Sequence, residues 1–143
     1  MNETVLKRVY TCWMLIEPAE DIPGVWVSHC LNFDVIAQGN DPIEARNHLR
    51  EAVQMAVLDD LVHGLDPLDR IAPEADWDRL ERVVNNGSPV KLDAIDPGQK
   101  VVLAMNETFA VQLSRVSSKS QPQPTTFTPM HIDSTPTVCH VAA

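Results

Sequence analysis

Histidine and cysteine side chains are the first candidates for chemistry in this sequence, because imidazole and thiolate groups are preferred ligands of zinc. His29, Cys30, His48 and His63 fall in the first half of the chain. Neighbouring strand residues such as His29 and Cys30 point to opposite faces, and the sequence contains no CxxC or HxxxH pair. The same poor spacing applies to three residues near the end of the chain: His131, Cys139 and His140. We therefore expect no metal ion and no other cofactor.

Carboxylates are the second candidates, because a cluster of them can hold the magnesium ions of a nuclease. Asp34, Asp59 and Asp60 are the candidates in the core region. Asp34 flanks the start of a predicted strand, whereas the other two lie late in a predicted helix. We do not expect the three side chains to converge on one site.

A cysteine nucleophile is the third possibility, and Cys12 and Cys30 are the residues to consider. Both lie in apolar stretches, where a cysteine is typically a small buried hydrophobe. If the first two strands pair, these residues come opposite one another, and a reducing cytosol would keep them as thiols. No Gly-rich phosphate loop or Ser-His-Asp pattern occurs either, so the sequence predicts a protein that is not an enzyme.

The charge of the chain points to a protein partner. Its 143 residues include 20 acidic and 11 basic side chains, which gives a net charge of −9. A negative surface repels nucleic acid and anionic lipid and favours association with a basic protein. No stretch approaches a membrane span, and no signal peptide or disulfide framework is evident. We expect a cytoplasmic protein with no membrane contact.

The elements of the first half are predicted from turn and strand patterns. Residues 4–17 are rich in β-branched and aromatic side chains, and residues 18–24 have the composition of a loop. Residues 25–31 and 33–39 are two further strand-like runs separated by Asn32, a residue that tolerates tight turns. The sequence predicts a three-stranded antiparallel meander.

A long helix follows the meander. Asp41 is the predicted N-cap, Pro42 the first helical residue and Glu44 the capping-box partner, and Gly64 is the predicted stop. We expect Gly39, between strand and cap, to have a positive φ. The apolar residues at helical spacing predict one face on the sheet: Leu49, Ala52, Val53, Ala56, Val57 and Leu61. Three more apolar residues of this helix, Met55, Leu58 and Val62, widen the apolar surface beyond one sheet contact. They predict an interface between copies of the chain in a homodimer or larger oligomer.

The second half predicts a shorter helix over residues 75–86, with Trp77, Leu80, Val83 and Val84 on one side. Residues 100–105 and 108–113 are then predicted to form a β-hairpin across Asn106-Glu107. The Ser, Thr, Gln and Pro content from residue 115 onward is typical of disorder. We therefore expect a domain over residues 1–114 and a disordered tail over residues 115–143.

These elements predict an α+β fold in the order β-β-β-α-α-β-β, in which one long helix packs on an antiparallel meander and a short helix and a β-hairpin follow. Residues 24–53, GVWVSHCLNFDVIAQGNDPIEARNHLREAV, resemble the signature of the HicB-like antitoxin family. The resemblance covers residues 1–65 or so, and it implies a sheet like part of a ribonuclease H-like or double-stranded-RNA-binding domain. Its signature residues are expected to maintain the fold: Gly24, Trp26, Cys30, Leu31, Gln38, Gly39, Asp41, Pro42, Glu44 and Ala45.

The resemblance implies that the protein neutralises a small basic RNA-cleaving toxin, of the HicA-like kind, by binding it directly. Many members of the family add a DNA-binding module, but residues 75–86 are acidic and no recognition helix is evident, which makes operator binding doubtful. The alternative is a stand-alone HicB-like oligomer that serves as a structural or small-ligand-binding module without a cognate toxin.

Overall fold

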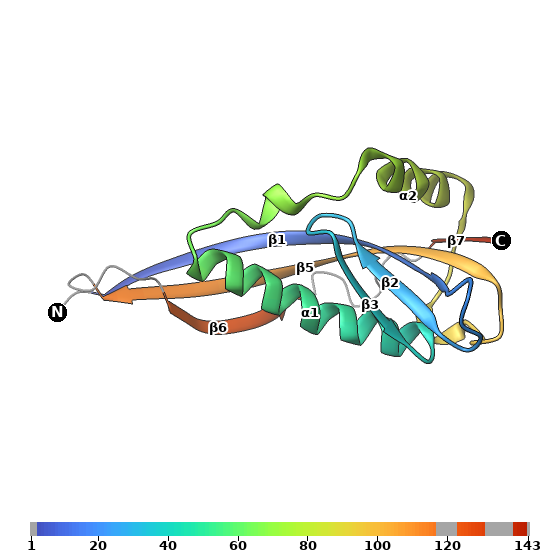
Figure 1. Ribbon diagram of the computed structural model, residues 1–143, viewed down its shortest axis with the longest axis horizontal. Coiled ribbons are helices and arrows are strands. Elements are labelled where there is room, and N and C mark those ends of the chain that lie inside the picture. The colour runs from blue at the N-terminus through green and yellow to red at the C-terminus, as the bar shows by residue number, and fades with distance from the viewer. Residues whose placement is uncertain (1–2, 117–122, 131–138, 143) are drawn as a thin grey trace.

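In the computed structural model, the described residues form an α+β fold with two helices packed against an antiparallel sheet (Figure 1). The structure describes residues 3–116, 123–130 and 139–142. The strands are β1 (Glu3–Pro18), β2 (Trp26–Cys30), β3 (Val35–Gly39), β4 (Ser88–Pro89), β5 (Val101–Val116), β6 (Gln123–Met130) and β7 (Cys139–Ala142). The helices are α1 (Pro42–Val62) and α2 (Glu74–Asn86), with short 3-10 turns η1 (Pro67–Arg70) and η2 (Leu92–Ala94).

The predicted meander is confirmed, because β1, β2 and β3 pair in sequence as antiparallel neighbours. The turn between β2 and β3 differs in one detail from the prediction. Asp34, and not Asn32, takes the positive φ of 51°. Asn32 instead accepts a hydrogen bond at its Oδ1 from the backbone N–H of Trp13, 2.6 Å away, and so ties the turn to β1.

The hairpin predicted across Asn106-Glu107 is wrong. These residues lie inside β5, where Asn106 pairs with Trp13 and Glu107 with Cys12. The antiparallel register of β1 and β5 runs without a break from Glu3 opposite Val116 to Ile16 opposite Leu103. An Asn-Glu pair lacks the glycine that favours a two-residue turn, so the long ladder with β1 prevails over a weak local signal.

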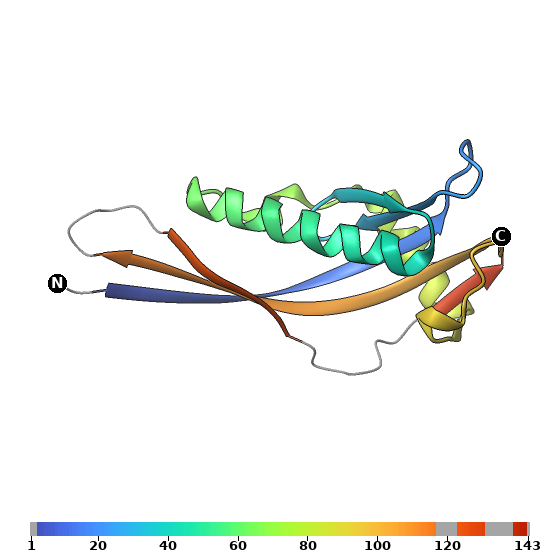
Figure 2. The same ribbon diagram turned by 90° about the horizontal axis from the view of Figure 1, so that it is seen from below.

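The β1–β5 ribbon is longer than the layer that covers it. Figures 1 and 2 both show that it extends beyond the C-terminal end of α1, toward the N-terminus of the chain. The far edge of β5 carries two further strands: β7 pairs with residues 101–104 and β6 with residues 108–114. The sheet order is β3-β2-β1-β5-β7-β4, with β6 attached to β5 beside β7.

The structure also differs from the prediction of a disordered tail. Two described segments of that region, β6 and β7, are strands of the sheet. Pro124 and Pro129 belong to β6, which pairs only with β5 among the described strands. Proline is tolerated in such an edge strand because one side of the strand needs no N–H donors. The other predicted tail residues, 117–122, 131–138 and 143, lie outside the described residues.

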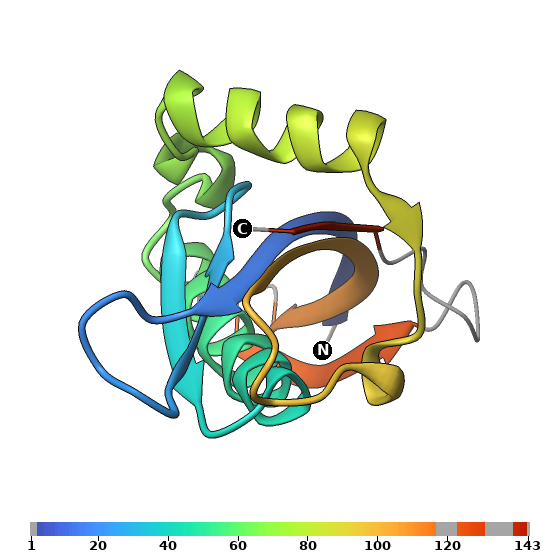
Figure 3. The same cartoon turned by 90° about the vertical axis from the view of Figure 1, so that its right-hand side faces the viewer.

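The two helices cover opposite faces of β1, as the end view in Figure 3 shows. Cys12, Met14 and Ile16 of β1 pack in the cluster that α1 completes, whereas Leu15 packs in the cluster beneath α2. This alternation follows from the two-residue period of a strand. The helix predicted over residues 75–86 is confirmed, with Leu80 and Val83 buried. Four residues of α1 lie in the first cluster: Ala45, Leu49, Val53 and Val57.

Candidate partner-binding surface

Most of the signature residues lie where β2, β3 and α1 meet. Gly39 shows why this junction requires a particular residue type. Its φ is not positive, contrary to the prediction, since the positive-φ glycines among the described residues are Gly24 and Gly64. The requirement is for space: a Cβ on Gly39 would lie 2.5 Å from the backbone N of Ala45 and 2.8 Å from the backbone C of Glu44. Glycine therefore allows β3 to approach the first turn of α1.

The start of α1 is capped as the sequence predicts. Asp41 Oδ1 accepts a hydrogen bond from the backbone N–H of Glu44 at 2.7 Å, and Glu44 Oε1 accepts one from the backbone N–H of Asn40 at 3.2 Å. The buried hydroxyl of Ser28 in β2 donates to the carbonyl of Ala45 at 2.7 Å. The two capping contacts give partners to N–H groups that the helix N-terminus otherwise leaves unpaired, and the Ser28 contact ties β2 to the first turn of α1.

Other signature residues connect this unit to more distant parts of the chain. The buried indole of Trp26 donates from Nε1 to the carbonyl of Pro97 at 3.0 Å. Leu31 donates its N–H to the carbonyl of Trp13, and its own carbonyl accepts from Ala72, each at 2.8 Å. Gln38 is exposed, and its carbonyl lies 2.7 Å from Nδ1 of His48. These signature residues therefore connect segments of the chain to one another.

The residues considered for catalysis do not converge in the described part of the chain. His29 pairs with Asp34 at 2.7 Å on the surface, and His63 lies 3.4 Å from Asp59. Asp60 turns into the protein. Among the described residues no group of three or more His, Cys, Asp and Glu side chains could hold a metal ion. His131 lies outside the described residues, and Cys139 and His140 belong to β7.

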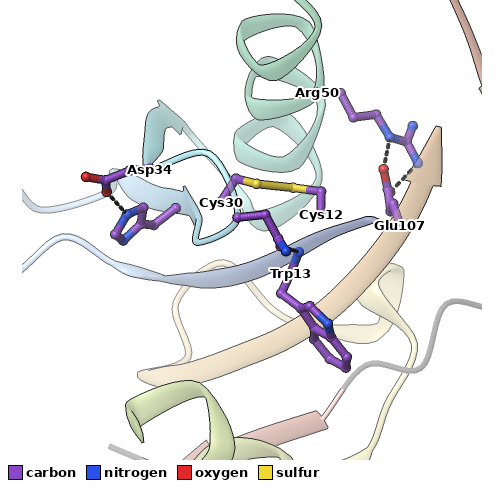
Figure 4. The surroundings of a disulfide bond; sticks show 8 residues. Cys12, Trp13, Cys30, Asp34, Arg50 and Glu107 are labelled. Carbon is purple, nitrogen blue, oxygen red and sulfur yellow. Dashed lines mark hydrogen bonds and ion pairs between the residues drawn. A yellow bond between two sulfur atoms is a disulfide. The ribbon is translucent and has the colours of Figure 1, made fainter. Parts of the chain in front are cut away.

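Cys12 and Cys30 are joined as a disulfide across β1 and β2 (Figure 4). Their Cα atoms are 6.0 Å apart, and both residues lie in the core, with 4% and 0% of their surface exposed. The two cysteines are close but not directly opposite as predicted, because Cys30 pairs with Met14, two residues from Cys12, and the disulfide differs from the expected thiols. Their burial places the pair in the core and away from a surface where a nucleophile would meet a substrate.

The three residues predicted to form an oligomer interface do not share one environment. Met55 is 72% exposed, whereas Leu58 packs against the core cluster beneath α1 and Val62 is half-buried. Earlier in α1, Arg50 makes an ion pair with the sheet: its Nε donates to the carboxylate of Glu107 in β5 at 2.6 Å (Figure 4). Met55 is thus the member of this predicted set that the described chain leaves open.

A surface that the sequence reasoning missed lies between the two helices. We call residues 64–73 the connector; in Figure 1 it is the green segment that joins α1 to α2 and contains η1. Leu65, Leu68 and Ile71 in the connector are 58%, 51% and 60% exposed. Asp66 and Asp69 alternate with them and are also exposed. The recurrence of leucine, leucine and isoleucine at every third position of LDPLDRI was the available signal, because such spacing within a Pro- and Asp-containing turn segment leaves the apolar residues without a helical or strand period that would bury them.

The outer face of α2 is acidic. Glu74, Asp78 and Glu81 are exposed at a spacing that places them on one helical stripe. In the part of the chain that the structure describes, no side-chain hydrogen bond or ion pair joins the carboxylates of these three residues to another residue. Arg79, by contrast, pairs with Glu17 of β1. The helix sequence EADWDRLERVVNN has four acidic and two basic residues, a net charge of −2.

A charge in the connector affects a tyrosine of the sheet. Burial raises the pKa of the Tyr10 hydroxyl above its ordinary value, and the negative charge of Asp66 raises it further. The hydrogen bond to Asp60 raises the pKa of Arg70. In α1, burial and then the charge of Arg50 lower the pKa of Arg46. The negative field of the connector therefore reaches the ring of β1.

Comparisons with known proteins do not add a relative. No family model matches the chain, and no curated protein and no solved structure matches it significantly. Within the described residues, no helix is long and apolar enough to cross a membrane. The likeness to the HicB-like family consequently rests on residues 24–53 themselves.

Proposed function

We propose that this protein acts by binding another protein, as an antitoxin-like chain that neutralises a small basic RNA-cleaving toxin of the HicA-like kind. The observation that carries the proposal is the acidic outer face of α2, where Glu74, Asp78 and Glu81 are exposed and make no ion pair with another described residue. Together with the net charge of −9, this face attracts a basic partner and orients its approach.

The mechanism we propose is occlusion and not catalysis. Residues 24–53 carry the resemblance to HicB-like antitoxins, and the contacts of this segment with the rest of the chain make it a scaffold for the surfaces around it. A bound antitoxin would cover the RNA-binding surface of the toxin. The meander with α1 is the part that we compare with a partial ribonuclease H-like or double-stranded-RNA-binding sheet.

The proposal is tested by co-expressing the full chain with a short basic reading frame encoded beside it and measuring complex formation and RNA cleavage. We expect a stoichiometric complex in which RNA cleavage is inhibited. Association should slow as ionic strength rises, because exposed charges act mainly on the association rate. A nuclease that remains fully active with excess protein would contradict the proposal.

A matched pair of charge variants tests whether the acidic face of α2 is the source of the salt-dependent association. Replacing Glu74, Asp78 and Glu81 by their amides should slow association and reduce its dependence on salt. The control removes three exposed charges elsewhere, through Glu20→Gln, Asp21→Asn and Glu51→Gln. Equal effects in the two variants would show that net charge acts without any contribution from the position of α2.

We also propose that arbitrary duplex DNA is not bound, since α2 is acidic on its outer face and phosphate contacts require lysine and arginine. A gel-shift assay with the isolated protein checks this statement. Binding to duplexes of unrelated sequence would contradict it, and tight, sequence-specific binding would contradict the view that residues 75–86 contain no recognition helix.

The second candidate is a stand-alone HicB-like oligomer without a toxin, and the exposure of Met55 favours it. A large apolar side chain on a helix surface is common at interfaces between copies of a chain. Light scattering of the wild type and of Met55→Ser tests this candidate. A dimer that becomes a monomer in the variant supports self-association through α1, and a wild-type monomer at micromolar concentration removes it.

A further inference from the structure

We propose that the connector, residues 64–73, is a docking site for apolar side chains of a basic protein partner. This inference rests on the proposed function and deepens it by naming where the partner is held. The acidic face of α2 attracts the partner over distance, whereas the connector supplies short-range apolar contacts. The two surfaces follow one another directly in the chain, because α2 begins at Glu74.

The connector is a fixed segment of the chain. At its start, Leu65 donates its N–H to the carbonyl of Asp60 at 2.8 Å; near its end, Ala72 donates to the carbonyl of Leu31 at 2.8 Å. In the middle, Arg70 makes a two-pronged ion pair with the carboxylate of Asp60, with distances of 2.6 and 2.7 Å. The carboxylate of Asp60 is buried, with 1% of the side chain exposed.

The 3-10 turn at the centre of the connector spans Pro67–Arg70, so it contains Leu68, while Leu65 precedes it and Ile71 is its C-cap. Asp66 caps the turn by accepting a hydrogen bond from the N–H of Leu68 at 3.0 Å. Side chains three residues apart then eclipse one another. Within the turn these are Pro67, which is buried, and Arg70, whose guanidinium reaches the buried carboxylate of Asp60, so these two residues hold the turn against the protein. Leu65, Leu68 and Ile71 are left exposed to solvent, and we call them the apolar row because they recur at every third residue.

A fixed segment that exposes three large apolar side chains is unusual for a surface loop. Loops are commonly polar, and contiguous apolar surface on a soluble protein often marks an interaction site. The ion pair and the hydrogen bonds order this segment before any partner arrives. Binding there would cost less conformational entropy than binding to an unordered loop.

The charges around the apolar row identify its occupant. Asp66 and Asp69 lie between the apolar residues, and Glu74 follows at the start of α2. The one basic side chain of the connector, Arg70, is engaged with Asp60. A second copy of this chain would bring the same carboxylates face to face if two connectors met. A partner segment with leucine or aromatic anchors between lysines or arginines fits both the apolar row and the charges.

The experiment uses the full chain and a synthetic peptide of lysine and leucine arranged as an amphipathic helix. A peptide in which serine replaces every leucine serves as the charge-only control. Fluorescence anisotropy measures the dissociation constants, and NMR chemical-shift mapping locates the contact. We expect the lysine-leucine peptide to bind with shifts at residues 64–73, and the lysine-serine peptide to bind more weakly by at least about tenfold.

The variant of the site is Leu68→Ser with Ile71→Ser, and the matched control is Ile22→Ser with Ile36→Ser, two exposed apolar residues outside the connector. The site variant should weaken the lysine-leucine peptide by at least about tenfold, and the control variant should not. Equal binding by both variants, shifts confined to other residues, or no saturable binding below about 1 mM would each overturn the inference. So would a change of oligomeric state in the site variant alone, because the connector would then hold a second copy.

The failure of this inference is distinguishable from the failure of the proposed function. If the co-expressed nuclease is bound and inhibited equally well by the wild type and by the connector variant, the antitoxin-like function stands and the docking site is elsewhere. If the nuclease is not bound by the wild type, while the peptide still binds at the connector, the antitoxin-like function fails and the docking site stands.

Discussion

Two regions of the molecule direct their side chains differently. One is the unit formed by β2, β3 and α1, and the other is the connector. In the unit, Trp26, Ser28 and the cap of α1 make their hydrogen bonds within the chain, and Leu49 is fully buried. In the connector, the backbone is held just as firmly but three large apolar side chains face solvent. The comparison teaches that an ordered backbone can either bury its side chains, which stabilises the fold, or hold them at the surface, where a partner can bind them. The burial of the side chains distinguishes the two cases.

The largest difference is expected between two leucine truncations. Leu49→Ala removes a fully buried side chain beneath α1 and should lower the free energy of unfolding by about 2–5 kcal/mol. Leu68→Ala removes a half-exposed side chain of the connector and should change it by no more than about 0.5 kcal/mol. Urea denaturation of both variants measures the difference. A large loss in Leu68→Ala would mean that this residue supports the fold.

A glycine pair tests whether the unit depends on close backbone approach. Gly39→Ala would place a Cβ 2.5 Å from the backbone N of Ala45 and should cost about 1–3 kcal/mol or more. Gly98→Ala is the control, because its Cβ would meet only the side chain of Asp96, at 3.4 Å. Thermal unfolding compares the two. A melting temperature for Gly39→Ala equal to that of the control would show that α1 moves away from β3 without penalty.

Two neighbouring aspartates test whether the connector is held from beneath. Asp60→Asn weakens the buried partner of Arg70, whereas Asp59→Asn changes an exposed carboxylate near His63. We expect Asp60→Asn to lower the melting temperature more than Asp59→Asn, because an imperfectly paired buried group is costly. Hydrogen exchange should also quicken at the amides of Leu65 and Ala72. Unchanged exchange there would mean that the backbone hydrogen bonds alone order the connector.

The smallest expected effect is the titration of Tyr10, the single tyrosine of the chain. Burial and Asp66 raise its pKa, so ultraviolet absorbance should place its midpoint above the ordinary value of about 10. The unfolded chain loses this proton first, and the stability due to neutral Tyr10 is therefore present below about pH 10 and is lost as the pH rises further. Asp66→Asn should move the midpoint back toward the ordinary value. No movement would leave burial as the sole cause.

The sequence by itself determined the local structure of the first half of the chain. The strands of the meander, the cap at Asp41 and the helix up to Gly64 follow from turn residues, apolar periodicity and capping chemistry, and the structure has them. These signals act between residues that are close in sequence, so they can be recognised without knowing which other segments pack against them in the fold. The requirement for glycine at position 39 was recognised, but its cause, the approach of Ala45, was not.

The helix of the second half was also predicted from the sequence, but only the tertiary structure decided the strands that follow it and the surface. Whether Asn106-Glu107 turns or continues as a strand depended on β1, which lies far away in the sequence and offers β5 a long ladder. β6 and β7 joined the sheet because the far edge of β5 was available for pairing. The exposure of Leu65, Leu68 and Ile71 followed from Asp60 and Leu31, which fix the opposite side of the connector. Pairing and burial are decided between segments distant in sequence, and local patterns carry no record of that choice.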